Sequence, residues 1–163
     1  MKSKNGEHPW GDTGQLILFL CFMIVWVGDS FFLRISTSPS ASLPLSIRLF
    51  IMILAMIIGV YLAKEGHVVA SREHSPPGVV STGAFRYVRH PLYLASLLFY
   101  FGLAASTTCL FSFGLLVVIF FFYNYIARYE EKLLEERYGE DYLLYKKNTG
   151  RWIPKLKSMS TKS

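Results

Sequence analysis

The side chains best suited to chemistry gather in residues 83–93, a basic and aromatic stretch that leads directly into a long apolar run. Pro91 marks a helix start, because proline lacks an N–H that would have no partner in the first turn. Arg86, Arg89 and His90 lie immediately before it. Free N–H groups and the positive dipole end of a helix N-terminus favour anions. The stretch therefore predicts one wall of a pocket for a carboxylate or phosphate.

A second set of candidates follows the last apolar run and begins with the adjacent carboxylates Glu130 and Glu131. Neighbouring side chains on a helix point about 100° apart, so the two need not share a role. Glu131 and Glu135 stand at helical spacing beside Lys132 and Arg137, a pattern typical of a solvated face. Taken alone, this pattern leaves a solvated face and a site wall both open.

The composition indicates a membrane protein. Of 163 residues, 52% are hydrophobic and only 17% are charged, which is too apolar for a soluble domain of this length. The formal charge of +6 lies in residues that flank apolar runs and form no continuous patch, so it favours an anionic membrane face over nucleic acid. Cys21 and Cys109 suggest neither a disulfide framework nor a metal site, and we expect both to be packing residues.

The elements that must position these residues are all helical. We expect one membrane domain, 1–163, with about four transmembrane helices over residues 14–33, 45–63, 91–108 and 109–127 and a C-terminal amphipathic helical region. The third and fourth spans form a tight hairpin, and Gly139 punctuates the charged continuation of the fourth. Asp29 lies near the far end of the first span, where we expect it to pair with Arg34. Trp152 is expected to anchor the tail at the headgroup level.

The distribution of lysine and arginine predicts the orientation. These residues are concentrated in the connection between the second and third spans and in the tail, and are sparse at the other two connections. Basic residues near span ends favour the cytoplasm, so we expect a multi-pass protein with both termini cytoplasmic. Segments 64–93 and 128–154 then face the same compartment. They can build one cofactor-binding site.

The combined pattern resembles the superfamily of isoprenylcysteine carboxyl methyltransferases and phospholipid methyltransferases. It consists of Arg-His-Pro-x-Tyr, one helical hairpin, Glu-Glu-x-x-Leu, Tyr-Gly-x-x-Tyr, Tyr-Lys-Lys and a final proline, and it covers roughly residues 79–154. The resemblance implies S-adenosylmethionine held at the cytosolic face and a lipophilic acceptor that enters from the bilayer. A glycine-rich turn of the Rossmann type is absent from the sequence, as expected for such an enzyme.

The resemblance also implies site residues. The cofactor contacts of the family fall on Val79, Val80, Phe85, His90, Pro91, Leu92, Tyr93 and Glu130. A carboxylate can bind ribose hydroxyls or an ammonium group, an aromatic face can meet adenine or the sulfonium, and a histidine can donate to the ligand carboxylate. The aromatic residues can also be read as interfacial anchors, and Arg89 as a contact to lipid phosphate.

One departure concerns the acceptor. Relatives of the prenylcysteine enzymes carry an arginine one turn before the acidic contact, where this chain has Ile126. Arg128 points about 160° away around the helix, and Arg151 in the tail is the other candidate replacement. A carboxylate acceptor needs orientation and exclusion of water. A phospholipid amine also needs a base, for which Glu131 and His67 are candidates.

The leading hypothesis is an S-adenosylmethionine-dependent methyltransferase most like the isoprenylcysteine carboxyl O-methyltransferases. The alternatives are a phospholipid N-methyltransferase, a sterol-reductase-like enzyme that uses NADPH, and a non-enzymatic membrane protein that binds lipid or a partner through its basic face. Binding of S-adenosylhomocysteine, of NADPH, or of neither separates these classes.

Overall fold

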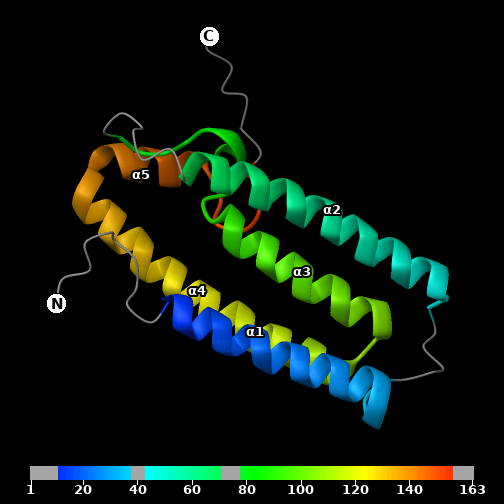
Figure 1. The fold of residues 1–163 in the computed structure, drawn as a ribbon. Helices are drawn as coiled ribbons and strands as arrows, with labels where there is room; N and C mark the ends of the chain where they lie inside the picture. Colours follow the sequence, from blue (N-terminus) through cyan, green and yellow to red (C-terminus); the bar gives the residue numbers. More distant parts are fainter. Residues whose placement is uncertain (1–10, 38–42, 71–77, 156–163) are drawn as a thin grey trace.

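The chain forms a bundle of long helices in the computed structural model, which describes residues 11–37, 43–70 and 78–155 (Figure 1). The elements are α1 (Gly11–Val27), a π-helical turn η1 (Gly28–Leu33), α2 (Leu45–Ala70), a 3₁₀ turn η2 (Gly83–Arg86), α3 (Pro91–Thr107), α4 (Leu110–Tyr138) and α5 (Glu140–Asn148). Those ranges contain no β-strand, only two isolated bridges. The prediction of an all-α membrane bundle is confirmed.

Three helical segments are long and apolar enough to cross a membrane. They are Thr13–Leu33 with 21 residues, Leu45–Val68 with 24 and Leu110–Tyr138 with 29. Pro91–Thr107 is apolar but shorter, and its 17 residues extend about 25 Å at 1.5 Å per residue, less than a hydrocarbon core of about 30 Å. The chain is an integral membrane protein in which Pro91–Thr107 is shorter than the other three apolar helical segments.

Helix α3 lies at the centre of the packing. It runs beside α2 over most of its length and contacts α4 and α1, while α1 also packs on α4 (Figure 1). The main core cluster joins Phe22 of α1 to Leu97, Tyr100 and Ala104 of α3 and to Ile119 of α4, all buried. Because α3 is held from three sides, the residues at its N-terminus have fixed positions.

The end of the bundle away from Pro91 is closed by polar contacts. Helix α3 passes into α4 through Thr108, which has a left-handed backbone, and Cys109, so the predicted tight hairpin is confirmed. The buried Asp29 carboxylate accepts hydrogen bonds from Ser36, Thr37 and the Cys109 thiol. The expected pairing with Arg34 is therefore wrong, since the chain turn brings hydroxyl and amide donors closer.

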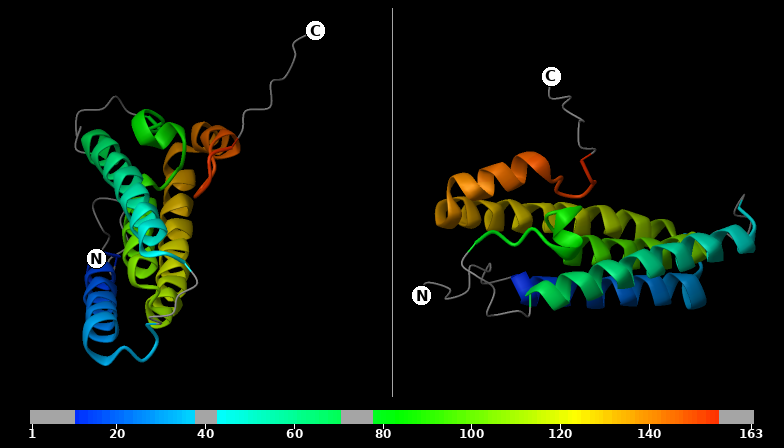
Figure 2. Two further views of the ribbon diagram at one scale, coloured as in Figure 1. Left: turned by 90° about the vertical axis from the view of Figure 1, so that its right-hand side faces the viewer. Right: turned by 90° about the horizontal axis from the view of Figure 1, so that it is seen from above.

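The opposite end carries the charged segments. Helix α2 continues to Ala70, seven residues beyond the predicted end of the second span, and residues 71–77 of the predicted cytosolic connection lie outside the described part. Helix α4 continues to Tyr138 and ends at Gly139, whose φ of +54° suits glycine. The chain then reverses into α5. Both views in Figure 2 place η2 and α5 at this same end.

Candidate functional site

Two segments far apart in sequence meet beside the start of α3. The backbone N–H of Arg89 donates to the carbonyl of Gly150 at 2.9 Å, within a parallel bridge between Val88 and Gly150. The Tyr145 hydroxyl of α5 donates to the Phe85 carbonyl at 2.7 Å. The loop before α3 is thus fixed to α5 and the tail by backbone contacts as well as side chains.

The buried carboxylate of Glu131 lies at the centre of this junction. Its side chain is 2% exposed, and it accepts from Arg89 Nε at 3.0 Å, from His90 Nε2 at 3.2 Å and from Arg151 through Nε at 2.8 Å and Nη2 at 2.7 Å. A buried charge is tolerated only when opposite charges and hydrogen bonds compensate it. Glu131 therefore ties α4, the start of α3 and the tail together. The alternative of a solvated face is wrong for this residue.

The two arginines of the cluster reach it from different segments. Arg89, with a side chain 8% exposed, also donates to the carbonyls of Lys146 and Thr149, so its interpretation as a lipid-phosphate contact is wrong. Arg151 donates through Nη1 to Asn124 Oδ1 at 2.9 Å. The Glu131 carboxylate, as hydrogen-bond partner, raises the pKa of the Arg151 guanidinium above its usual value.

Glu130 points to a different side of α4 from its neighbour. Its Oε1 accepts from the Tyr93 hydroxyl at 2.5 Å, and its Oε2 lies 3.6 Å from His90 Nδ1. The His90 ring stacks on Tyr93 with 5.6 Å between centroids, and Tyr93 stacks on Tyr123 at 5.2 Å. His90 thus lies between the two adjacent carboxylates, and Tyr93 is fixed by a carboxylate and two rings.

A cavity of about 270 Å³ opens beside these side chains. Its walls come from the loop before α3, the first turn of α3 and the charged half of α4. They are Phe85, Arg89, His90, Pro91, Leu92, Tyr93, Glu130, Leu133, Leu134 and Arg137. The structure therefore brings together six of the predicted cofactor contacts: Phe85, His90, Pro91, Leu92, Tyr93 and Glu130.

The other predicted site residues lie elsewhere. Val79 lines a separate cavity of about 490 Å³ between its loop and α5, and Val80 is 37% exposed on that loop. Arg128 is exposed on α4 and is not among the residues that line the 270 Å³ cavity. His67 is exposed near the end of α2. Glu131 is outside the cavity lining and contacts His90 and Arg89, which line it, and Arg151 in turn contacts Glu131.

Sequence reasoning missed several members of the site. Leu133, Leu134 and Arg137 follow Glu130 at three, four and seven residues, the spacing of one helix face, and this signal could have identified them. Asn124, an amide within an apolar run, accepts from Arg151 and from the Trp152 indole at 3.4 Å. A polar residue inside an apolar span is also a signal of a functional or structural contact, and it could have identified Asn124.

Trp152 has a different role from the one expected. Its ring lies 5.9 Å from the ring of His90 and 5.8 Å from that of Phe120. The half-buried indole therefore packs over the junction of α3 and α4, and the tail covers His90. In α5, burial raises the pKa of Tyr142 and Tyr145 above the usual tyrosine range, so both phenols remain neutral donors.

The side chains that line the cavity are suited to bind a small zwitterion that has an aromatic portion. Glu130 offers a carboxylate to hydroxyl or ammonium groups, Arg89 and Arg137 offer cations to a carboxylate, and Tyr93 and Phe85 offer ring faces. In the described ranges, no group of three or more histidine, cysteine, aspartate or glutamate side chains could hold a metal ion.

Comparison with known proteins gives a consistent result. Residues 42–141 match the family model described as phospholipid methyltransferase. The chain is 31% identical over 91 residues to the protein-S-isoprenylcysteine O-methyltransferase of Saccharomyces cerevisiae (strain ATCC 204508 / S288c), a match that covers 54% of this chain and 37% of the yeast protein. No solved structure matches the chain. With the family model covering more than half of its length, this membrane protein belongs to the phospholipid methyltransferase family.

Proposed function

We propose that the protein transfers a methyl group from S-adenosylmethionine to a lipophilic acceptor at the cytosolic membrane face, as an isoprenylcysteine carboxyl O-methyltransferase does. The observation that carries this proposal is the 270 Å³ cavity, where Glu130 on one segment meets Tyr93 and His90 on the other. Its chemistry fits the donor, which supplies an electrophilic sulfonium methyl group when bound.

Each wall residue has a role in holding that donor. Glu130 accepts hydrogen bonds from ribose hydroxyls or from the ammonium group, Arg137 neutralises the ligand carboxylate, and His90 donates a hydrogen bond to that carboxylate. Tyr93, held by Glu130 and the stacked His90 ring, presents its face to adenine or the sulfonium. The carried-over positions Val79 and Val80 contribute backbone and apolar contacts from the adjoining loop.

The acceptor carboxylate is oriented by Arg151 in this proposal. Ile126, at the position where the prenylcysteine enzymes carry arginine, is buried and apolar. The Arg151 guanidinium reaches α4 from the tail and contacts Asn124 and Glu131, which lie two turns apart on one face. At 100° per residue, Asn124 and Glu131 point about 160° and 140° away from Ile126, so the tail delivers this cation to a different face of α4. Arg128, exposed on α4, is the less suited candidate.

The environment of Glu131 favours a carboxylate acceptor over an amine. Two arginines and His90 already hydrogen-bond its oxygens, so it is a poor base for a phospholipid ammonium group. A carboxylate acceptor is deprotonated at neutral pH and requires no base, only alignment with the methyl group and exclusion of water. Glu131 then acts as a positioning residue for His90 and Arg151.

The proposal includes a topology. With both termini and the segments 64–93 and 128–154 in the cytoplasm, the single domain 1–163 exposes its basic connection and tail to anionic lipid, in agreement with the lysine and arginine distribution. The donor reaches the cavity from water, and the acceptor reaches it from the bilayer.

Incubation of the purified protein with methyl-labelled S-adenosylmethionine tests this function. The acceptors are S-farnesylcysteine with a free carboxylate, its amide, and phosphatidylethanolamine. We expect label in the free carboxylate alone, and at least about a tenfold loss in Arg151→Gln, with Lys155→Gln as the matched tail control. Label in phosphatidylethanolamine would favour N-methylation. Binding of NADPH without any label would support the reductase-like alternative, and binding of neither would support a non-enzymatic protein.

A further inference from the structure

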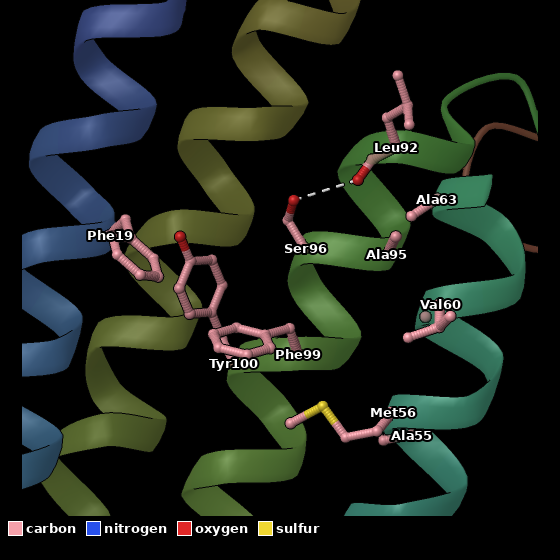
Figure 3. Close-up of a pocket in the computed structure, with 11 residues that line it drawn as sticks. Phe19, Ala55, Met56, Val60, Ala63, Leu92, Ala95, Ser96, Phe99 and Tyr100 are labelled. Carbon is pink, nitrogen blue, oxygen red and sulfur yellow. Dashed lines mark hydrogen bonds between the residues drawn. The ribbon is translucent and has the colours of Figure 1, made fainter. Parts of the chain in front are cut away.

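A second cavity, of about 430 Å³, lies in the membrane part of the bundle beside α2 and α3 (Figure 3). Its size falls in the range of small-molecule sites, about 300–1,000 Å³. The lining residues are Ala55, Met56, Gly59, Val60 and Ala63 of α2, Leu92, Ala95, Ser96, Phe99 and Tyr100 of α3, and Phe19 of α1. We call this space the α2–α3 groove.

The groove is long and follows one face of each helix. The lining positions recur every three to four residues, from Ala55 to Ala63 on α2 and from Leu92 to Tyr100 on α3. Eight steps on each helix cover about 12 Å at 1.5 Å per residue. The helices approach closely where their residues are small. A Cβ at Gly59 would lie 3.3 Å from the Ala95 carbonyl oxygen. The groove is therefore a single lane that runs along the line where α2 and α3 meet, with Phe19 of α1 at its edge.

Almost nothing polar faces this lane. Ser96 and Tyr100 are the only lining residues with a polar side chain, and the Ser96 hydroxyl already donates to the Leu92 carbonyl at 3.2 Å (Figure 3). An occupant with polar groups would lose hydration without gaining partners. An unbranched or branched hydrocarbon chain would bury apolar surface at no such cost.

Leu92 lies between the groove and the site, because it lines both the α2–α3 groove and the 270 Å³ cavity. Its position is defined by α2, where a Cβ at Gly66 would lie 3.1 Å from Leu92 Cδ2. Met56 and Ala55 lie at the end of the groove away from Leu92 (Figure 3). One end of the lane thus meets the reacting groups, and the other meets a flexible methionine.

We propose that the α2–α3 groove holds the single isoprenoid chain of the methyl acceptor and that Met56 determines the preferred chain length. This inference rests on the proposed function and adds the place where the acceptor chain binds and the residue that determines its length. One lane of about 12 Å suits one chain, whereas a phospholipid brings two acyl chains. Because Leu92 borders both spaces, the head of the chain lies at Leu92, next to Tyr93, and the tip lies beside Met56.

Photolabelling tests the groove without any need for turnover. The probe is S-farnesylcysteine with a diazirine on its terminal isoprene, bound to protein in phosphatidylcholine nanodiscs and mapped by peptide mass spectrometry. Competitors are the geranyl, farnesyl and geranylgeranyl cysteines and phosphatidylethanolamine. We expect label on peptides that contain Met56 or Phe99, displaced by farnesylcysteine and not by phosphatidylethanolamine.

Two opposite substitutions test the chain-length role. Met56→Phe fills the far end of the groove and should shift the relative affinity of the competitors at least about tenfold towards geranylcysteine. Met56→Ala enlarges that end and should shift the relative affinity at least about tenfold towards geranylgeranylcysteine. One methylene in an apolar pocket changes affinity by about this factor. Ile57, the next residue, is 61% exposed outside the groove, so Ile57→Phe should shift nothing. Opposite shifts cannot arise from misfolding.

Three results would overturn the inference. They are label spread over exposed residues of other helices, such as Val118 of α4, displacement of the probe by phosphatidylethanolamine, and a chain-length order unchanged by both Met56 variants. S-adenosylhomocysteine binding, measured on the same samples, reports on the proposed function independently. If the cofactor analogue binds while the groove takes no label, the groove assignment fails and the methyltransferase proposal stands. If the groove is labelled while the cofactor analogue does not bind, the groove assignment stands and the methyltransferase proposal fails.

Discussion

Replacement of Glu131 by glutamine should destabilise the protein strongly, although the change preserves the shape of the side chain. The carboxylate is 2% exposed and holds Arg89, His90 and Arg151, which come from two separate segments. Loss of one charge of a buried pair costs about 3–5 kcal/mol, because its partners stay buried without compensation. Since the Arg151 side chain is 21% exposed and gains hydration, we expect about 3 kcal/mol.

The assay is urea unfolding in a mild detergent, read as the free energy of unfolding. The matched control is Glu135→Gln on the same helix, because Glu135 pairs with Lys146 but is 31% exposed. A pair of that kind contributes less than about 1 kcal/mol. The double variant Glu131→Gln with Arg151→Gln should cost less than the sum of the single changes by about 1 kcal/mol or more, since contacting residues are not additive.

The reasoning would be refuted if Glu131→Gln lowered the free energy of unfolding no more than Glu135→Gln does. Additive effects of the Glu131 and Arg151 changes would refute it as well, because they would mean that the two side chains do not depend on each other.

Two further predictions concern how the loop before α3 is held. Gly150→Ala should cost about 1–3 kcal/mol by thermal denaturation, because its Cβ would lie 1.8 Å from the Ile153 carbonyl oxygen. The control Gly114→Ala, with open space around it, should be neutral. Equal effects of the two substitutions would contradict a steric role for Gly150. Tyr145→Phe removes the hydrogen bond to Phe85 and should cost about 1 kcal/mol. Because burial raises the pKa of Tyr145 in the folded state above its usual value near 10, its contribution is present below about pH 10 and is lost as the pH rises further. Melting temperature between about pH 9 and pH 11 should therefore fall more steeply in the parent than in Tyr145→Phe; parallel slopes would count against the assignment.

Much of the fold followed from local patterns in the sequence. Apolar runs long enough for a bilayer predicted α1, α2 and α4. Pro91 marked the start of α3, because a proline lacks the N–H that the first turn does not use. Gly139 marked the end of α4, because its positive φ favours glycine. The end of α2 at Ala70 was missed, because a charged residue ends an apolar pattern without ending a helix.

The site was predictable only where its residues form a contiguous motif. His90, Tyr93 and Glu130 were identified through the ordered pattern of two segments. The burial of Glu131 was not, since one helix face with alternating charges looks solvated until another chain segment covers it. The contacts of Asn124 with Arg151 and Trp152 depend on where the tail folds back, and no local pattern encodes that.

The most direct test of the account is calorimetric titration of the purified protein with S-adenosylhomocysteine, because the central idea is one cofactor cavity built from both segments. We expect binding by the parent, at least about a tenfold weaker affinity for Glu130→Gln and for His90→Ala, and unchanged affinity for Glu136→Gln, whose exposed side chain lies outside the cavity lining. Unaltered affinity in both Glu130→Gln and His90→Ala, or no binding by the parent, would contradict it.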